Sequence, residues 1–528
     1  NKLDLAFNKG RANDRKVWLV DGSKGKNPDY NKKNMTFNEF VDEELINFSL
    51  ADNERSLPNH IDGLKPAQRK VLFASFKRNL KNEIKVAQLA GYISEHAAYH
   101  HGEVSLEKTV KNMAQNYVGS NNLNYLEGIG QFGTRRQGGD DAAQSRYIFT
   151  KLSPLTRLIF KQNDDKLCNY LNDDGFPIEP EYYYPILPNI LINGSSGIGT
   201  GFSSDIPQFN PMDISNYILN KLNKQELNLE LKPWYRGFKG NIQSTSPGSY
   251  ITVGKYEVVN ESTIRITELP VGTWTEKYID YLDKISVERG KESAKNFVRS
   301  LTDNSSDTTV DITIKMNPNI LSKWSNKVGK DGIIEIANRL KLTSTISTSN
   351  MHMFDKNLSI KKFKTIEELI DDWYQLRINI YVKRRDYLLK NLKKELDIIK
   401  YKVKFIEEVN SNTLDIRNKK KQTIISNLES KAYPKFSNEK NLNSYDYLLN
   451  MSIYKLTFEE IEELKKKKEI KEADYNLLFS KTEKDLWIED INEFKTNYIK
   501  YLNKFNKEYF NVNDNKKKSK GKKIKIKK

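Results

Sequence analysis

The chain has 528 residues, too many for one ordinary core, and this length predicts roughly three or four domains. Its net charge of +18 favours an anionic partner, although nine lysines and no acid in residues 516–528 supply half of that charge. A single cysteine, Cys168, excludes an internal disulfide and a cysteine-based zinc site. No apolar run is as long as a membrane span and no signal peptide opens the chain, so no membrane partner is expected.

Residues 1–35 are polar and rich in Lys and Asn, and Gly22, Gly25 and Pro28 interrupt any periodicity. This pattern is typical of a connector. The first residue is Asn1 rather than Met, which indicates a piece of a longer protein.

From Phe37 to about Tyr184 the pattern is dense and helical. Pro66 is suited to the first position of a helix that runs through Phe76. A second helix is predicted by the four-three-four spacing of Leu106, Val110, Met113 and Tyr117. Short helices with basic faces and few strands favour a helix-turn-helix or winged-helix domain.

Around residues 186–360 the chain changes character. The segments 250–253, 263–266 and 310–314 alternate apolar and polar residues, as half-buried strands do, and residues 277–285 are helical in pattern. A mixed domain of helices and strands is expected here.

A long coiled-coil-like helix is predicted after residue 361, with a break in its apolar repeat near 383–385. A returning helix is predicted over 487–501, and capping boxes are expected at Thr457 and Thr482. An antiparallel two-helix arm with a small helical knob is therefore expected, and an ordinary helical bundle is the alternative. The Lys-rich end is expected to be disordered.

Neither metal nor nucleotide chemistry is supported by the residues. Five histidines and one cysteine offer no ligand cluster, since the adjacent His100 and His101 point in different directions on any regular element. No Gly-x-x-x-x-Gly-Lys-Ser/Thr motif occurs, and the glycines of residues 197–201 have the wrong spacing for dinucleotide binding. Taken alone, those glycines are typical of a tight turn.

Basic and aromatic residues fall close together in the first third of the chain, which favours a phosphate-binding face, with a solvated basic surface as the alternative. They are Arg55, Lys65, Arg69, Lys70, His100, His101, Arg135, Arg136, Arg146 and Tyr147.

A series of motifs in this region resembles the cleavage domain of type IIA DNA topoisomerases. The resemblance spans about residues 2–505, in order and without large gaps, and is closer to the single-chain enzymes of eukaryotes and large DNA viruses than to gyrase. The motifs are 49–58 (SLADNERSLP), 62–72 (DGLKPAQRKVL), 85–91 (KVAQLAG), 99–103 (YHHGE), 114–122 (AQNYVGSNN), 130–135 (GQFGTR), 145–150 (SRYIFT), 185–188 (PILP), 193–201 (NGSSGIGTG), 233–240 (PWYRGFKG), 267–270 (TELP), 445–449 (YDYLL) and 484–487 (KDLW).

The resemblance implies an α+β multidomain fold. The expected segments are a connector after a TOPRIM domain, a winged-helix domain with the catalytic tyrosine, a mixed α/β tower domain, a coiled-coil arm with a helical gate tip, and a disordered tail. Their expected boundaries are 1–35, 36–185, 186–360, 361–512 and 513–528.

The resemblance also implies the reaction. A tyrosine of the winged-helix domain attacks a DNA phosphodiester, which leaves a transient 5′-phosphotyrosine and allows a second duplex to pass through a double-strand break. By position this tyrosine is Tyr147. A phenol has a pKa of about 10, so it needs proton removal or stabilisation of the developing charge. Arg146, Arg55 and His101 match the family's phosphate-clamping arginine, its second catalytic cation and its imidazole.

Further residues are expected to contact DNA. Lys65 matches a lysine of the DNA-binding face. Ile198 matches the isoleucine that wedges between base pairs and bends the duplex. Asp140 departs from the family, whose members usually carry a lysine there, and this puts a phosphate contact at that position in doubt. The remaining expected DNA contacts are Arg69, Lys70, His100 and Arg135.

Members of the family bind Mg²⁺ in a TOPRIM domain and hydrolyse ATP in an N-terminal domain. Neither the Glu-Gly-Asp-Ser nor the Asp-x-Asp-x-Asp motif occurs here, so both cofactors are expected to bind domains absent from this chain. The expected partners are double-stranded DNA, a second copy of the chain through the C-terminal gate (C-gate) and winged-helix domains, and a TOPRIM/ATPase region on the same or another polypeptide.

Two alternatives stay open: a non-catalytic DNA-bending protein of the same fold, and a separate A-type topoisomerase subunit. The expected location is the nucleus for a cellular protein, and the host cytoplasm, viral factory or nucleus for a viral one.

Overall fold

The structure is a computed structural model and describes residues 2–22, 28–29, 31–226, 230–286, 297–329, 331–436, 444–452 and 455–519, with side chains as far as residue 509. The chain forms two compact units, Asn1–Arg377 with Ile488–Lys528, and Ile378–Trp487. The expected boundaries at residues 35, 185 and 360 lie inside the first unit and stay predictions.

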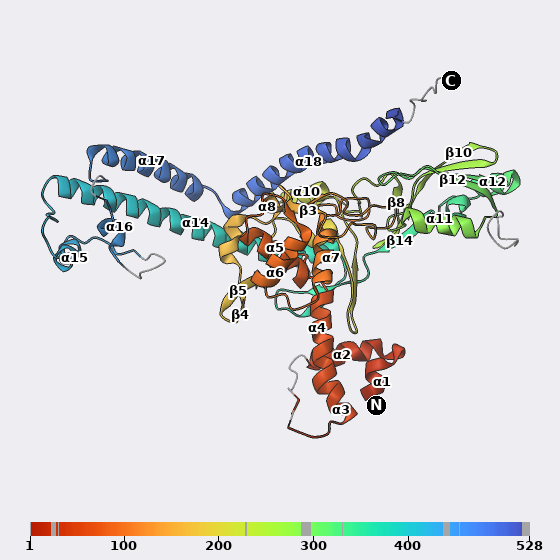
Figure 1. Ribbon diagram of the computed structural model, residues 1–528, viewed down its shortest axis with the longest axis horizontal. Helices are drawn as coiled ribbons and strands as arrows, with labels where there is room; N and C mark the ends of the chain where they lie inside the picture. Colours follow the sequence, from red (N-terminus) through yellow and green to blue (C-terminus); the bar gives the residue numbers. More distant parts are fainter. Residues whose placement is uncertain are drawn as a thin grey trace, which may run out of the picture. The chain divides into compact units, whose positions relative to one another are not determined.

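The first unit opens with a small helical region (Figure 1). Leu19, Val41 and Ile46 are almost fully buried there and pack into one apolar cluster. The expected connector is therefore helical and contributes to a core through Leu19, and its helix α2 ends beside Gly22, one of the residues expected to interrupt the pattern. The elements are α1 (Lys2–Phe7), η1 (Lys9–Arg11), α2 (Ala12–Asp21), α3 (Phe37–Glu39), η3 (Phe40–Leu45) and α4 (Ile46–Ser56).

A helical subdomain follows, with a three-stranded antiparallel sheet and a two-stranded one formed by β4 and β5. Pro66 begins a helix as predicted, and Leu106, Val110 and Met113 form the buried side of another, while Tyr117 lies just beyond it. The strand order is β1-β3-β2. The elements are α5 (Pro66–Lys77), β1 (Ile84–Lys85), α6 (Val86–His96), α7 (Glu103–Ala114), β2 (Leu126–Ile129), β3 (Phe149–Leu152), α8 (Thr156–Ile159), η4 (Gln162–Leu167), β4 (Tyr170–Asp173) and β5 (Phe176–Pro180).

The next region contains the expected mixture of strands and helices. Its larger sheets have the orders β10-β11-β13-β12 and β14-β9-β8, and the apolar faces of β11 and β13 meet α11 in a common core. The strand expected at 310–314 begins only at Ile312. Val310 is buried although it precedes the strand, so its apolar side chain does not mark the start of the sheet. The elements are α9 (Asn189–Asn193), β6 (Ser195–Ile198), β7 (Ser203–Ile206), α10 (Pro211–Leu222), β8 (Asn241–Ser246), β9 (Ser249–Val253), β10 (Lys255–Asn260), β11 (Thr263–Glu268), α11 (Thr275–Lys284), β12 (Val298–Asp303), β13 (Ile312–Met316), α12 (Pro318–Ser325), α13 (Glu335–Arg339), β14 (Thr343–Ser347), β15 (Met351–Phe354) and β16 (Ile360–Phe363).

The second unit is built on the long helix α14 (Ile366–Asn410), which is continuous through the expected break near 383–385. Its outer half is paired by α17 (Phe458–Ser480). Lys465 reaches Glu407 at 2.9 Å and Lys471 reaches Glu395 at 2.7 Å, so the two helices run antiparallel. The helix predicted over 487–501 is part of α18 (Glu483–Ser519). The helix that returns along α14 is α17, a pairing that the sequence pattern did not predict.

Both expected helix starts in this unit carry a cap. At Thr482 the box is complete, because Asp485 N–H donates to Thr482 Oγ1 at 3.2 Å and Thr482 N–H donates back to the Asp485 carboxylate at 2.8 Å. At Thr457 one half forms, from Glu460 N–H to Thr457 Oγ1 at 3.3 Å. Helix α18 continues to Ser519, past the expected start of disorder at residue 513, because helix formation propagates from its packed segment. Residues 520–528 lie outside the described residues.

The knob between α14 and α17 has its own core. Leu448 is buried with Leu428, and Tyr447, Met451 and Leu456 pack against them, beside α15 (Lys421–Ser430) and α16 (Asp446–Leu449). From the sequence, residues 445–464 are expected to form a dimer surface, because they hold more apolar side chains than a solvated helix tip would expose. Part of this apolar content is used by the knob's internal packing, and the dimer surface stays a prediction; Ile453 lies outside the described residues.

Candidate active site

Tyr147 lies on the loop between β2 and β3, and its ring is 65% exposed. The residues on either side of the Arg146–Tyr147 pair are anchored to the start of α6. Ile148 accepts a hydrogen bond from Val86 N–H at 3.0 Å, and Ser145 accepts one from Ala87 N–H at 3.2 Å. Since both neighbours are buried, Arg146 and Tyr147 are presented outward on a fixed backbone.

The Arg146 guanidinium lies over the Tyr147 ring, 4.9 Å from its centroid. The backbone N–H of Tyr147 donates to the Gln144 carbonyl at 2.9 Å, which closes a tight turn just before the ring. A cation so close to an exposed phenol can stabilise negative charge that develops on an attached or attacked phosphate.

The remaining two expected catalytic residues lie on other elements. Arg55 is in the last turn of α4, about half exposed, with an ion pair to Asp52 at 2.9 Å. His101 is exposed just before α7, edge-on to Tyr99, with 5.4 Å between ring centroids. Among the described residues, a direct contact joins Tyr147 to Arg146, whereas Arg55 and His101 are each accessible from their own element.

Ile198 lies at the end of β6, in the β6–β7 hairpin, and is 84% exposed. The hairpin is seated directly on the end of α4. A Cβ on Gly197 would stand 2.0 Å from the carbonyl oxygen of Ser56, and one on Gly199 would stand 2.2 Å from Asn53 Oδ1. Both glycines are therefore required by the close approach of the hairpin to α4, and the wedge role of Ile198 stays a prediction.

Asp52 connects this hairpin to the expected catalytic arginine. Its carboxylate accepts a hydrogen bond from Thr200 Oγ1 at 3.0 Å and pairs with Arg55. Lys65 supports the same hairpin by donating to the Ser196 carbonyl at 2.7 Å, and burial lowers the pKa of Lys65. Asp52 was not predicted from the sequence. Its position three residues before Arg55 on one helix could have indicated the ion pair between them.

Three of the residues expected to contact DNA have partners within the protein. Arg69 is buried, and its guanidinium donates to Asp62 at 2.7 and 3.1 Å. Arg135 is buried against Glu268. Lys70 donates to the Ala97 carbonyl at 2.5 Å and to Glu179 at 2.8 Å. The donors of all three residues are thus engaged within the protein, and the expected contacts with DNA phosphates stay predictions. His100, by contrast, is 79% exposed in its side chain.

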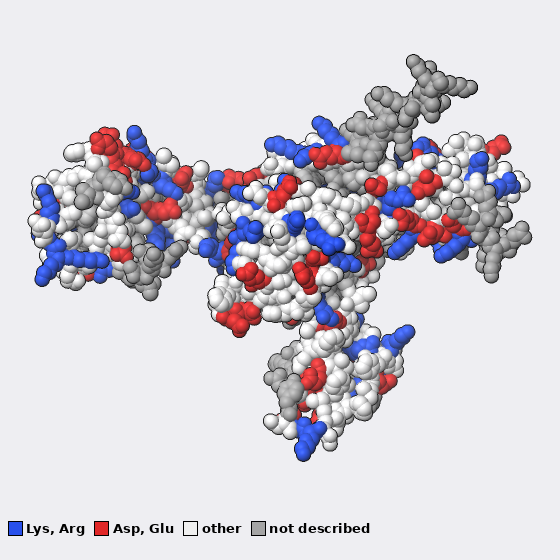
Figure 2. All heavy atoms as spheres, viewed as in Figure 1, with Lys and Arg blue, Asp and Glu red and all other residues white. Residues whose placement is uncertain are grey.

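The departure at Asp140 lies in the same loop as Tyr147. Asp140 is exposed, while its neighbour Asp141 accepts hydrogen bonds from Thr134 N–H at 2.8 Å and Thr134 Oγ1 at 2.5 Å. On the face shown in Figure 2, acidic and basic side chains are interspersed over both units. Net charge alone therefore does not locate a DNA surface.

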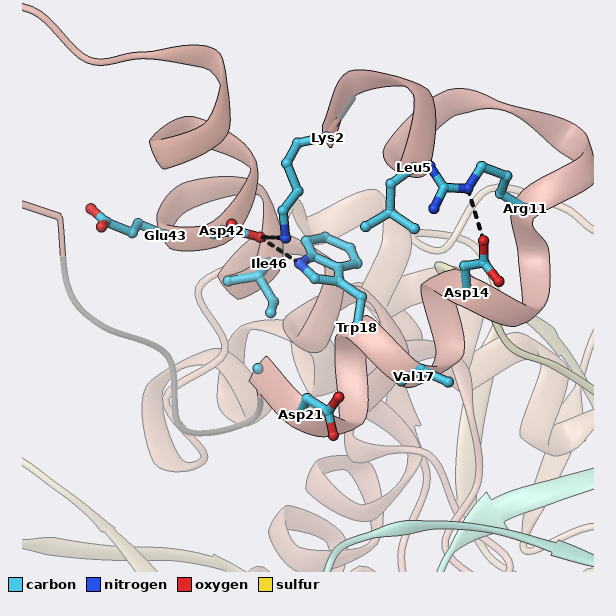
Figure 3. Close-up of a pocket in the computed structure, with 11 residues that line it drawn as sticks. Lys2, Leu5, Arg11, Asp14, Val17, Trp18, Asp21, Asp42, Glu43 and Ile46 are labelled. Atoms are coloured by element: carbon cyan, nitrogen blue, oxygen red, sulfur yellow. Dashed lines mark hydrogen bonds and ion pairs between the residues drawn. The ribbon is translucent and has the colours of Figure 1, made fainter.

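A cleft of about 720 Å³ lies among the N-terminal helices (Figure 3). Trp18 and Lys2 both donate to Asp42 at 2.9 Å at its edge. None of the expected site residues lines it. Among the described residues no three His, Cys, Asp or Glu side chains come together as a metal site, and no helix there is long and apolar enough to cross a membrane.

Comparison with known proteins decides the family. Residues 55–492 match the family of the DNA gyrase and topoisomerase IV A subunits, and residues 1–53 match the C-terminal associated domain of TOPRIM. The chain belongs to the type IIA DNA topoisomerases. The resemblance seen in the motifs is thereby confirmed.

Eukaryotic DNA topoisomerase 2 proteins are similar to most of this topoisomerase chain. That of Plasmodium falciparum is 41% identical over 93% of the chain, and that of Saccharomyces cerevisiae is 39% identical over 95%. A mitochondrial one from Dictyostelium discoideum is 41% identical over 96%. The chain spans 36%, 37% and 38% of these three relatives respectively, so it corresponds to little more than a third of their length.

A solved structure gives the same result for the fold. The DNA-binding, cleavage and re-ligation domain of Plasmodium falciparum topoisomerase II superposes with a TM-score of 0.83 at 41% identity, over 95% of this chain and 70% of that one. The α+β multidomain fold with a long helical arm is therefore confirmed, and the fold is that of a topoisomerase II cleavage domain.

Proposed function

We propose that this chain binds, breaks and rejoins duplex DNA as part of an ATP-dependent type II DNA topoisomerase, with Tyr147 as the nucleophile. The observation that carries the proposal is the exposed Tyr147 ring under the Arg146 guanidinium, on a loop anchored on both sides to α6.

In the proposed reaction, the Tyr147 oxygen forms a bond to a DNA phosphorus while the bond from that phosphorus to the 3′ oxygen breaks. The phenolic proton passes to a base, for which we propose His101, and the leaving 3′ oxygen takes up a proton. One phosphodiester replaces another, so the reverse attack by the 3′ hydroxyl reseals the strand without a nucleotide. Arg146 and Arg55 are proposed to stabilise the charge on the phosphate oxygens during both steps.

The type II topoisomerase family uses Mg²⁺ and ATP. The described residues offer no cluster that fits a metal ion, and the sequence has no phosphate-binding glycine loop, so we derive no step through either group. We propose that both bind outside these 528 residues, in a TOPRIM/ATPase region of the same or another polypeptide.

The proposed substrate is double-stranded DNA, bent by Ile198 as an exposed apolar wedge. A two-fold dimer through the winged-helix region and the gate end of the second unit would place one Tyr147 on each strand, as a double-strand break requires. Its eukaryotic relatives favour a nuclear enzyme, although one of them is mitochondrial.

The test is Tyr147→Phe in the full-length protein. Removing one oxygen deletes the attacking atom but keeps the ring, so duplex binding should be unchanged and no denaturant-resistant protein–DNA complex should form. The matched control is Tyr170→Phe, another partly exposed tyrosine, which should form the complex at the normal level. If the Tyr147→Phe protein still traps DNA covalently, another residue is the nucleophile. If the unmodified protein bends DNA but never traps it, the non-catalytic alternative holds.

A further inference from the structure

The end of α18 returns to the first unit and docks there through aromatic side chains. Tyr501, Phe505 and Tyr509 repeat every four residues, so they share one face of the helix. Phe505 and Tyr509 are only 7% and 8% exposed, with their rings stacked at 4.9 Å between centroids. Such burial so late in a helix indicates a specific docking site rather than a fraying end.

The docking site is an aromatic platform formed by Tyr117 and Trp274, which pack with Phe505 and Tyr509 in one cluster. Tyr117 and Trp274 meet edge to face at 5.7 Å between centroids. Aromatic pairs of this geometry add to the stabilisation that comes from buried area alone.

A buried cation ties α18 to the same place. The Arg236 guanidinium lies 4.2 Å from the Phe505 ring centroid and donates to Tyr501 Oη at 3.0 Å. Tyr501 Oη donates in turn to Asn124 Oδ1 at 2.5 Å. Since Arg236 is only 3% exposed, removal of these aromatic side chains would leave a buried charge with fewer partners.

The loop that leads to Tyr147 also rests on this platform. A Cβ on Gly138 would stand 2.3 Å from the Trp274 ring, and one on Gly139 would stand 2.6 Å from Tyr117 Oη, so the loop backbone lies directly against the Trp274 ring and the Tyr117 hydroxyl. Both glycines have φ in the left-handed region, at 67° and 90°, which lets the chain turn at this contact.

A series of hydrogen bonds connects the platform to the rest of this loop. Tyr117 Oη donates to Gln115 Oε1 at 3.1 Å, and Gln115 Nε2 donates to the Phe132 carbonyl at 3.0 Å. Next to Phe132, the Gln131 carbonyl accepts from Ala143 N–H at 2.9 Å, four residues before Tyr147. The platform thus supports both ends of the loop.

Beside this face a cleft of about 390 Å³ lies between α18 and β2, lined by Lys500, Lys504 and Glu508 on the helix and by Glu127 and Ile129 on the strand. Nearer its start, α18 is also held by the fully buried Ile491 and Phe494 and by the pair of Asp490 with Lys161 at 3.0 Å. The aromatic face is thus the attachment of the later part of the helix, next to the loop that leads to Tyr147.

We propose that Phe505 and Tyr509, with Tyr501, are positioning residues for DNA cleavage: docked on the platform, they hold the loop of residues 130–147 in the geometry that presents Tyr147. The proposal rests on the proposed role of Tyr147 as nucleophile.

The first test measures the loop itself, in the 528-residue chain, by hydrogen exchange. With Phe505→Ala, the backbone amides of residues 131–143 should exchange about tenfold faster, because local opening needs less free energy, while those of the β6–β7 hairpin should not change. The matched control is Ile499→Ala, an apolar truncation on the exposed face of α18, which should leave the loop unchanged. Unchanged exchange in the loop with Phe505→Ala would overturn the proposal.

The second test measures cleavage in the full-length protein. Phe505→Ala should slow formation of the covalent complex about tenfold at unchanged duplex affinity, whereas Tyr509→Phe, which keeps the ring, should retain the normal rate. Faster loop exchange without slower cleavage would overturn the positioning role. Hydrogen exchange in the loop does not depend on whether Tyr147 attacks DNA, so it tests the docking alone. If Tyr147 is not the nucleophile, the unmodified protein will form no covalent complex at Tyr147, whatever the exchange result.

Discussion

At the scale of single residues, function depends on which polar side chains the backbone turns outward. Arg146 and Tyr147 are exposed between the buried residues Ser145 and Ile148. Arg135, eleven residues before Arg146, and Arg69, earlier in the chain, have their guanidinium groups buried on carboxylates. The same guanidinium group is thus available to solvent in one case and committed to the core in the other.

Arg146→Ala should lower the rate of covalent complex formation by about 10²–10³, because one donor to the charge of the transition state is lost. Duplex binding should change little, since many other contacts hold the DNA. Arg339→Ala, at an exposed ion pair of the tower region, is the matched control and should cleave normally. Equal rates for the two variants would remove Arg146 from the site.

Arg69→Ala should lower the free energy of unfolding of the chain by about 3–5 kcal/mol, because it leaves Asp62 buried without its cation. Denaturant unfolding measures this. A fully stable variant with weakened DNA binding would instead support Arg69 as a phosphate contact.

The sequence predicted these positions unevenly for a physical reason. Tyr147, Arg146 and Ile198 were found from motifs, and all three are exposed. Proximity in sequence cannot tell an exposed cation from one paired with a carboxylate of a distant segment, as with Arg135 and Glu268. Asp52 was missed because its second partner, Thr200, is 148 residues away.

At the scale of elements, the β6–β7 hairpin and α4 form one support for the exposed Ile198, the proposed wedge. Ile198→Ala should reduce the bend of a doubly labelled duplex measured by energy transfer, because a methyl group cannot fill the gap between unstacked base pairs. Val258→Ala, an exposed apolar truncation on β10, is the control and should leave the bend as it is. An unchanged bend in the Ile198 variant would make the hairpin a plain turn.

A contact between His60 and Asp372 holds the start of α14, and its contribution to stability should depend on pH. His60 Nε2 lies 2.9 Å from the Asp372 carboxylate, and His60, with Lys361 nearby, lowers the pKa of Asp372 below 3.8. A lowered folded-state pKa gives stability that is fully present above the unfolded value and is lost as the pH falls through the folded value.

Asp372→Asn should therefore lower the melting temperature at neutral pH, with a difference from the unmodified chain that shrinks as the pH drops below about 4. Asp371→Asn removes a more exposed ion pair with Lys221, so at neutral pH it should lower the melting temperature less than Asp372→Asn does. If Asp372→Asn lowers the melting temperature by the same amount at every pH, the assigned contact between His60 and the Asp372 carboxylate is contradicted.

Elements with a strong local signal were predicted well. Pro66 began its helix, β9 and β11 lie where the alternation placed them, and the boxes at Thr457 and Thr482 start helices. Periodicity gives the type of an element but not its partner. It therefore did not reveal that α17 pairs with α14, or that the knob buries its own apolar residues.

At the scale of the whole molecule, a duplex-binding dimer is predicted. Sedimentation of the 528-residue chain should give a dimer, since two-fold symmetry is what would bring two Tyr147 side chains to opposite strands. A monomer at micromolar concentration would contradict this.

DNA affinity should fall steeply with salt, because cations that contact phosphates release counterions. Deleting residues 516–528, with their nine lysines, should weaken binding equally for all sequences and reduce the salt slope, as fluorescence anisotropy can measure. Affinity that does not depend on salt would exclude phosphate contacts as its main source.

The central claim is that DNA becomes attached to Tyr147. The most direct measurement is to trap the covalent complex of the full-length protein with denaturant, digest both components, and identify the modified peptide by mass spectrometry. We predict a nucleotide joined through its 5′ phosphate to Tyr147, in the peptide that contains Ser145–Thr150. Attachment at any other residue, or attachment through a 3′ phosphate, would contradict the account.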